Sequence, residues 1–195
     1  LVLEAGYPPE GVSMLNCWGP LAGEMVEDDR IAMLSFTGSA SVGWMLKSKA
    51  GKKKVVLELG GNAGFIVHSD ADMSLAVREA ASGGFANAGQ NCISVQRMLV
   101  QQDVFEEFAD GFVEAVKALK VGDPRDADTD IGPLINEREA ERVENWVNDA
   151  VRAGATLLYG GQHQGAMFPP TVLGQTTNEM RVNCEEVFAP VVTLR

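Results

Sequence analysis

Two spacings of hydrophobic residues alternate along the chain. Short apolar runs, typical of buried strands, are followed by stretches in which apolar residues recur every three or four positions, as on one face of a helix. This alternation predicts an α/β fold. We expect strands at 14–18, 31–36, 55–59, 65–67, 95–100 and 156–159, and helices at 39–49, 104–119 and 137–153, with a further helix that begins at Ser69.

Polar and small residues mark the expected helix ends. Ser69 takes the cap position and Asp72 follows three residues later, as in a capping box. Gly154 is the expected C-cap of the helix at 137–153. We expect Trp18, Trp44 and Trp146 to pack in a core, and His68 and His163 to lie at the surface or in loops.

The bulk composition narrows the class of protein. The 195 residues are 46% hydrophobic, enough for one domain or for parts of two. A net charge of −11 argues against a nucleic-acid partner. No apolar run approaches the length of a membrane span, and the N-terminus lacks the pattern of a signal peptide. Both ends fall inside apolar stretches, so we expect the chain to be a piece of a longer protein.

The three cysteines, Cys17, Cys92 and Cys184, are odd in number and widely spaced, which argues against a disulfide framework. No C-x-x-C pair is present, so no structural zinc or other metal site is expected. Free thiols fit a reducing compartment, and we expect a cytoplasmic protein.

The segment 85–92, Phe-Ala-Asn-Ala-Gly-Gln-Asn-Cys, ends an apolar helix and presents Cys92 after a glycine turn. A thiolate adds readily to a carbonyl carbon, and free backbone N–H groups in such a turn can hold an oxyanion. The polar neighbours Asn87, Gln90 and Asn91 favour this interpretation modestly. The alternative is that Cys92 is a small, buried and inert apolar residue.

Glu58 lies in the apolar run Val55–Leu59, which two glycines, Gly60 and Gly61, follow. Burial of a carboxylate among aliphatic side chains raises its pKa, which suits a general base near neutral pH. The alternative is a glutamate that faces water through the simple alternation of a strand.

A second glycine turn, 36–43, joins an expected strand to an expected helix. Because helix N-termini bind anions, Gly38 and Ser39 are candidates for contact with a phosphate group. An ordinary serine N-cap is the competing explanation.

Several motifs in this order resemble the aldehyde dehydrogenase superfamily over essentially the whole chain. The segment 85–92 matches the family's cysteine motif, 58–61 its glutamate motif and 36–39 its phosphate-binding turn. The segment 185–190, Glu-Glu-Val-Phe-Ala-Pro, resembles a stretch that usually has glycine in place of Ala189. The segments 132–135 and 170–172 also fit, while Asn62-Ala63 replaces the Lys-Ser or Lys-Asn of many members.

The resemblance implies a fold and a domain plan. Residues 1–60 would be the C-terminal part of an NAD(P)-binding, Rossmann-like domain. Residues 61–195 would be a catalytic domain, truncated at its C-terminus, with an open, largely parallel sheet flanked by helices. The family's catalytic centre lies between these domains, and the intact parent would be a homodimer or homotetramer. We expect the 195-residue piece alone to be inactive.

The resemblance also implies residue roles. Cys92 would attack a small-molecule aldehyde, and Glu58 would activate the water that hydrolyses the resulting thioester to a carboxylic acid. NAD or NADP would accept the hydride. The cofactor would be bound by Gly38, Ser39, Leu59, Gly60, Glu186 and Phe188, and the substrate pocket would include Asn91 and Ile93.

Three alternatives remain. A coenzyme A-acylating relative would pass the thioester to a thiol, but such relatives generally lack a base at Glu58. A cofactor-independent thiol hydrolase would need His68 or His163 as the partner of Cys92. A non-catalytic scaffold would have no reason to retain both Cys92 and Glu58.

Overall fold

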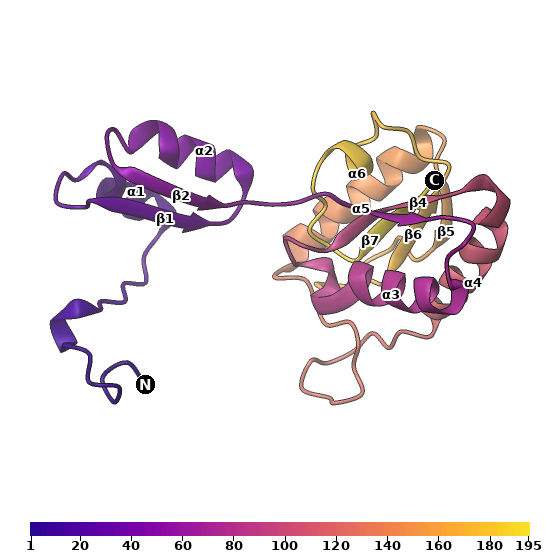
Figure 1. Cartoon of the computed structure of the whole chain (residues 1–195), viewed down its shortest axis with the longest axis horizontal. Helices are drawn as coiled ribbons and strands as arrows, with labels where there is room; N and C mark the ends of the chain where they lie inside the picture. The colour runs from indigo at the N-terminus through magenta and orange to yellow at the C-terminus, as the bar shows by residue number, and fades with distance from the viewer. The chain divides into compact units, whose positions relative to one another are not determined.

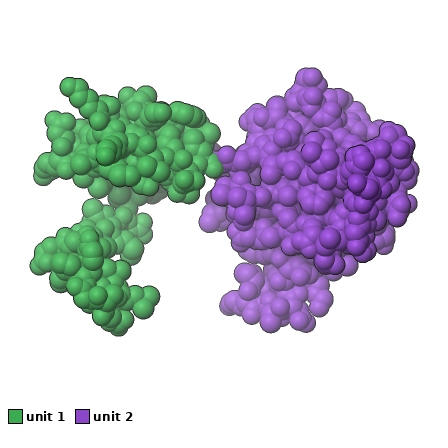
Figure 2. All heavy atoms as spheres, viewed as in Figure 1, with its two compact units in different colours: residues 1–59 green, residues 60–195 purple.

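The computed structural model describes residues 1–195, which divide into two compact units, Leu1–Leu59 and Gly60–Arg195. Figure 2 colours these units separately. The sequence-based expectation put the domain boundary one residue later, between residues 60 and 61.

The first unit pairs two strands and carries two helices. A short 3-10 helix, η1 (Pro9–Gly11), precedes α1 (Gly19–Glu27), β1 (Met33–Thr37), α2 (Ala40–Lys49) and β2 (Lys54–Glu58). The two strands are parallel, with Met33 opposite Lys54 and Thr37 opposite Glu58. The return from β1 to β2 therefore passes through α2, as parallel pairing requires.

Two expectations for this unit are wrong. Residues 14–18 form no strand, and Trp18 and Trp44 are 87% and 57% exposed rather than packed in a core. Two strands and two helices enclose little volume, and only Val26, Gly43 and Ala50 are buried. An apolar run cannot become a buried strand where no neighbouring strand is present to pair with it.

The second unit contains a five-stranded sheet in the order β3-β4-β7-β6-β5. Its strands are β3 (Ala63–Val67), β4 (Val95–Val100), β5 (Thr156–Tyr159), β6 (Thr171–Gly174) and β7 (Val191–Leu194). All neighbours are parallel except β5 and β6, which are antiparallel. The expected α/β class with an open, largely parallel sheet flanked by helices is confirmed.

Helices cover both faces of this sheet. In Figure 1, α3 (Met73–Phe85) and α4 (Phe105–Lys117) lie on one side, and α5 (Glu137–Arg152) and α6 (Arg181–Cys184) on the other. The sheet is buried throughout β6 and β7. On the α3–α4 side the rings of Phe85, Phe108 and Phe112 stack in the core. On the other side α5 buries the expected stripe Ala140, Val143, Trp146, Val147 and Ala150.

The helix ends differ slightly from expectation. Asp72, not Ser69, caps α3: its carboxylate accepts the Leu75 N–H at 3.0 Å, while the Ser69 N–H donates to the side chain of Gln101. The cap residue of α5 is Ala153, and Gly154 follows in a left-handed conformation with φ +106°.

Two short 3-10 helices adjoin the α-helices of this unit. They are η2 (Ala86–Gly89), after α3, and η3 (Gln102–Val104), before α4. No helix of the chain is both long and apolar enough to cross a membrane.

Candidate active site

Cys92 lies in an exposed turn between η2 and β4. The chain reaches this turn through three consecutive left-handed residues, Asn87, Ala88 and Gly89, with φ of 53°, 54° and 65°. Left-handed φ is unusual for non-glycine residues, so the chain reverses here at a conformational cost. The exposure of Cys92 excludes the buried, inert interpretation for this structure.

The turn leaves the backbone N–H of Cys92 without an acceptor in the protein. Its neighbours are held: the Ser94 N–H donates to the Asn91 carbonyl at 3.0 Å, and the Ile93 N–H to the Asn91 side chain at 3.3 Å. The Cys92 Sγ lies 3.8 Å from the same Asn91 Oδ1. A free N–H beside a thiol is the arrangement that an oxyanion hole requires.

Gln90 anchors the Cys92 turn to the loop before α5. Its Oε1 accepts the Ile135 N–H at 3.0 Å and its Nε2 donates to the Pro133 carbonyl at 3.3 Å. This gives a structural role to the segment 132–135, which the sequence placed only by resemblance.

Three glycines allow backbone segments to approach the turn closely. A Cβ on Gly61 would lie 2.3 Å from the Cys92 carbonyl oxygen, and one on Gly89 would lie 2.2 Å from the Ala189 carbonyl oxygen. A Cβ on Gly60 would lie 1.8 Å from a carboxylate oxygen of Glu186. The second unit thus brings Gly60 and Gly61 together with the cysteine turn and the segment 185–190.

Glu186 is partly buried, and its Oε1 accepts the Gly61 N–H at 2.8 Å. The other oxygen, Oε2, has no partner in the protein and faces Gly60. Phe188 follows in a left-handed conformation, φ 53°, and is 47% exposed. A carboxylate with one oxygen held and one free can accept a further hydroxyl donor.

The remaining expected site residues belong to the first unit. Gly38 donates its N–H to the Glu58 carbonyl at 3.0 Å, so the structure brings the turn that was expected to bind phosphate next to the end of β2. The side chain of Leu59 packs against Gly43 of α2. Glu58 is exposed, so the burial among aliphatic side chains that we expected is not seen in this unit.

Ser39 occupies the N-cap position of α2, yet its side chain makes no cap hydrogen bond. Its hydroxyl instead lies 3.3 Å from that of Ser41. The α2 N-terminus therefore keeps unpaired N–H groups, which suits an anionic group better than a fully capped helix does.

Neither histidine is a partner of Cys92. The His68 Nδ1 lies 2.9 Å from Asp70, and the His163 ring contacts Glu144 of α5. The backbone N–H of His163 also donates to Glu144, and this lowers the pKa of that carboxyl. No group of three or more His, Cys, Asp and Glu side chains is placed to hold a metal ion.

Gln96 is a buried polar residue that the sequence interpretation did not single out. It lies on β4, is 6% exposed and uses its whole side-chain amide in hydrogen bonds to the segment 182–187. The available signal was a polar residue inside the apolar run Val95–Val100.

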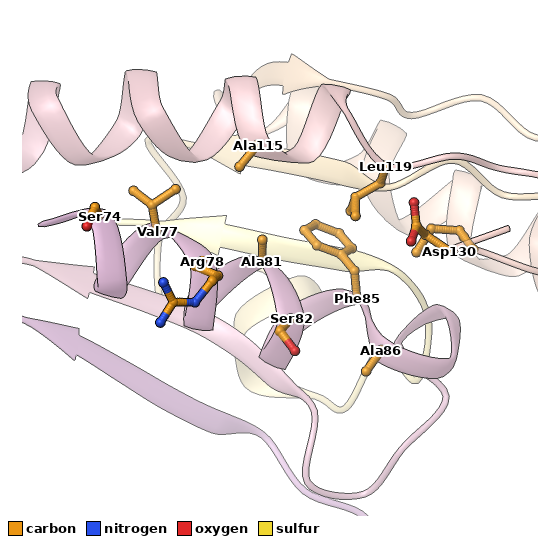
Figure 3. Close-up of a pocket in the computed structure, with 11 residues that line it drawn as sticks. Ser74, Val77, Arg78, Ala81, Ser82, Phe85, Ala86, Ala115, Leu119 and Asp130 are labelled. Carbon is orange, nitrogen blue, oxygen red and sulfur yellow. The ribbon is translucent and has the colours of Figure 1, made fainter. Parts of the chain in front are cut away.

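A separate hollow lies between α3 and α4, and we call it the α3–α4 groove (Figure 3). The side chains of Val77 and Phe85 point from α3 toward α4. None of the expected site residues lines it, although Phe85 and Ala86 begin the cysteine motif. Its full lining is Ser74, Val77, Arg78, Ala81, Ser82, Phe85, Ala86, Ala115, Leu119, Asp130 and Ile131.

Known proteins share both the sequence and the fold. Residues 1–195 match the Aldehyde dehydrogenase family. The chain is 44% identical to 3-sulfolactaldehyde dehydrogenase of Priestia aryabhattai, covering 100% of this chain and 41% of that protein. The structure of glyceraldehyde-3-phosphate dehydrogenase from Methanocaldococcus jannaschii with NADP is 40% identical, with a TM-score of 0.94. This match covers 99% of the present chain and 42% of the dehydrogenase chain.

A second similar structure is betaine aldehyde dehydrogenase of Staphylococcus aureus with NAD+, which is 33% identical with a TM-score of 0.94. This match covers 99% of the present chain and 40% of the betaine aldehyde dehydrogenase chain. The chain thus spans about two fifths of the length of these proteins. A match over every residue, with the expected motifs in order, leads to one conclusion: the chain belongs to the aldehyde dehydrogenase family.

Proposed function

We propose that this chain carries the nucleophile and the general base of an NAD(P)-dependent aldehyde dehydrogenase, which oxidises a small aldehyde to a carboxylic acid. The observation that carries the proposal is the exposed Cys92 beside its own free N–H, in a turn that Gly61 approaches closely, while Glu186 accepts the Gly61 N–H.

In the first step the Cys92 thiolate adds to the aldehyde carbonyl. A C–S bond forms, and the carbonyl oxygen becomes an oxyanion that the Cys92 N–H is free to stabilise. Asn91 and Ile93, which flank the nucleophile, would line the substrate pocket. When bound, NAD(P)+ supplies the hydride acceptor that oxidation of the Cys92 thiohemiacetal to a thioester requires.

The residues present fit such a cofactor. The free Oε2 of Glu186 can accept a ribose hydroxyl, and the exposed Phe188 ring offers a flat apolar surface near it in sequence. Gly38 and Ser39, at the incompletely capped α2 N-terminus, suit a pyrophosphate. Leu59 of the first unit and Gly60 of the second are the other residues that we propose for cofactor binding.

In the last step Glu58 takes a proton from water. The resulting hydroxide adds to the thioester carbonyl, the C–S bond breaks, and Cys92 leaves as a thiolate. A coenzyme A-acylating enzyme would need no such base, so Glu58 at the matching position favours hydrolysis. Neither histidine is hydrogen-bonded to Cys92, whose Sγ contacts Asn91 Oδ1 instead, and this disfavours a histidine-dependent thiol hydrolase.

The test uses the full-length protein and two variants. Cys92→Ala should lower kcat by more than about 10³-fold, because no other thiol lies in this turn. Glu58→Gln should give one equivalent of NAD(P)H in a burst and then turn over about 10²–10⁴-fold more slowly, because the thioester forms but is not hydrolysed. Cys184→Ala is the matched control and should retain activity.

The assay should cover both cofactors, a chemically broad aldehyde panel and reactions with and without coenzyme A, since the similar proteins are named for three different aldehydes. Turnover only with coenzyme A would replace the hydrolytic proposal by the acylating one. Full activity of Cys92→Ala would remove the proposal altogether. The 195-residue chain alone should show little turnover, and we propose a homodimer or homotetramer for the intact protein.

A further inference from the structure

The side chain of Gln96 makes three hydrogen bonds inside the second unit. Its Nε2 donates to the carbonyls of Val182 at 2.8 Å and Glu185 at 2.7 Å, and its Oε1 accepts the Val187 N–H at 2.9 Å. All three distances lie within the ordinary range of N–H···O hydrogen bonds, and the side chain is 6% exposed. Each donor and acceptor of the amide is therefore used, and its orientation is fixed by its partners.

Two of these bonds bracket Glu186. The Glu185 carbonyl belongs to the peptide group before residue 186, and the Val187 N–H to the peptide group after it. The side-chain amide of Gln96 thus offers these peptides the donor and acceptor that a neighbouring strand would offer. The Arg142 guanidinium adds a third contact by donating to the Val187 carbonyl at 2.8 Å.

Because both flanking peptide groups are hydrogen-bonded, the remaining conformational freedom of Glu186 lies in its side chain. The Gly61 N–H restrains this side chain by donating to its Oε1. Glu186 is therefore fixed from β4 through its backbone and from the Gly60–Gly61 segment through its carboxylate. Its free oxygen, Oε2, consequently has a defined place beside Gly60.

We propose that Gln96 is a positioning residue for cofactor binding: it holds the backbone of Glu186 so that the free carboxylate oxygen meets the ribose. This inference rests on the proposed role of Glu186 in holding the cofactor. Gln96 itself touches no cofactor. An apolar residue at 96 would leave two carbonyls and one N–H unpaired in the interior, and the segment 182–187 would move to satisfy them.

The experiment measures the dissociation constant of NADH and NADPH by fluorescence in the full-length protein. Gln96→Met keeps the length of the side chain and removes its polar atoms. It should weaken binding about tenfold, as does the loss of residues that orient metal ligands. The KM for the aldehyde should change less than about threefold, because the Cys92 turn is held separately through Gln90.

A matched control removes a buried hydrogen-bonded group elsewhere in the same sheet. Thr171 on β6 is fully buried; its hydroxyl accepts the Gly161 N–H and donates to the Pro169 carbonyl. Thr171→Val should lower Tm as Gln96→Met does but leave the cofactor dissociation constant within about twofold. Equal weakening by both variants at equal loss of Tm would overturn the proposal.

A double-mutant cycle separates the two levels of the argument. If Gln96 acts through Glu186, then Gln96→Met should add no further loss of affinity in the Glu186→Ala background. Full additivity would overturn the positioning role. Unchanged binding in Glu186→Ala alone would instead overturn the proposed role of Glu186.

Gln96→Glu covers the case in which Gln96→Met does not fold. This variant keeps the acceptor for Val187 but places a carboxylate oxygen against two carbonyls, and protonation restores one donor. Its cofactor affinity relative to wild type should therefore improve as the pH falls. A pH-independent ratio would count against the proposal.

Discussion

At the scale of single residues, the candidate site depends on close backbone approaches that only glycine permits. Gly61 lies against the Cys92 carbonyl and Gly89 against Ala189, so three motifs far apart in sequence meet without side chains between them. The sequence placed these glycines in motifs, but it did not show what each of them contacts. Those contacts are between segments, and residue spacing along one segment does not reveal them.

Gly61→Ala should destabilise the second unit by about 1–3 kcal/mol, because its Cβ would meet a backbone oxygen that cannot move independently of the cysteine turn. Urea unfolding measures this, and alkylation of Cys92 by limiting iodoacetamide should also change in rate. Gly64→Ala is the control: its Cβ would meet only a Leu99 methyl group at 3.8 Å. Equal unfolding free energies for the two variants would contradict the prediction.

At the scale of elements, periodicity placed most helices and strands of the second unit but not every helix end. The pattern at 69–72 contains two possible caps, and both Ser69 and Asp72 are residue types that favour that position. The choice depends on a contact outside the helix, since the Ser69 N–H donates to Gln101 and leaves Asp72 to accept Leu75. Helix α4 is also shorter than the helix expected at 104–119: it begins at Phe105 and ends at Lys117, so Leu119 lies outside it.

The Asp72 cap should make α3 sensitive to acid. The N–H of Leu75 and then the hydroxyl of Ser74 donate to this carboxylate, and they hold its pKa below the ordinary value of 3.8. A lowered pKa contributes stability above the unfolded-state pKa, and this contribution is lost as the pH falls through the native pKa. Asp72→Asn keeps the helix cap but has no carboxyl group to protonate. Its unfolding free energy relative to wild type should therefore rise as the pH is lowered from 6 to 3.

Urea unfolding across that pH range tests this, with Asp72→Ala as the reference without a cap. The alanine variant should be less stable than wild type at pH 6, and the gap should narrow at pH 3. An alanine variant as stable as wild type at pH 6 would show that the cap contributes nothing.

At the scale of the whole molecule, burial is distributed unevenly between the two units. One continuous core extends through the second unit from Val67 to Leu194, whereas three residues of the first unit are buried. The first unit also exposes large apolar side chains such as Met14, Trp18 and Trp44. Local opening costs little where few apolar contacts are broken.

In the 195-residue chain, amides of β1 and β2 should therefore exchange with solvent at least about 100-fold faster than those of β4 and β7. Hydrogen exchange followed by mass spectrometry resolves these segments. Equal protection of β1 and β7 would contradict the expectation that the first unit lacks a stabilising core.

The sequence by itself determined the α/β class, most elements of the second unit and the order of the motifs around Glu58, Cys92 and Glu186. These follow from hydrophobic periodicity and from residue types at fixed spacing, both of which act locally. Tertiary structure decided the rest: that residues 14–18 form no strand, that Asp72 caps α3, and that Gln96 brackets Glu186. Each of these depends on which distant segment supplies a pairing strand, a hydrogen-bond partner or a covering surface.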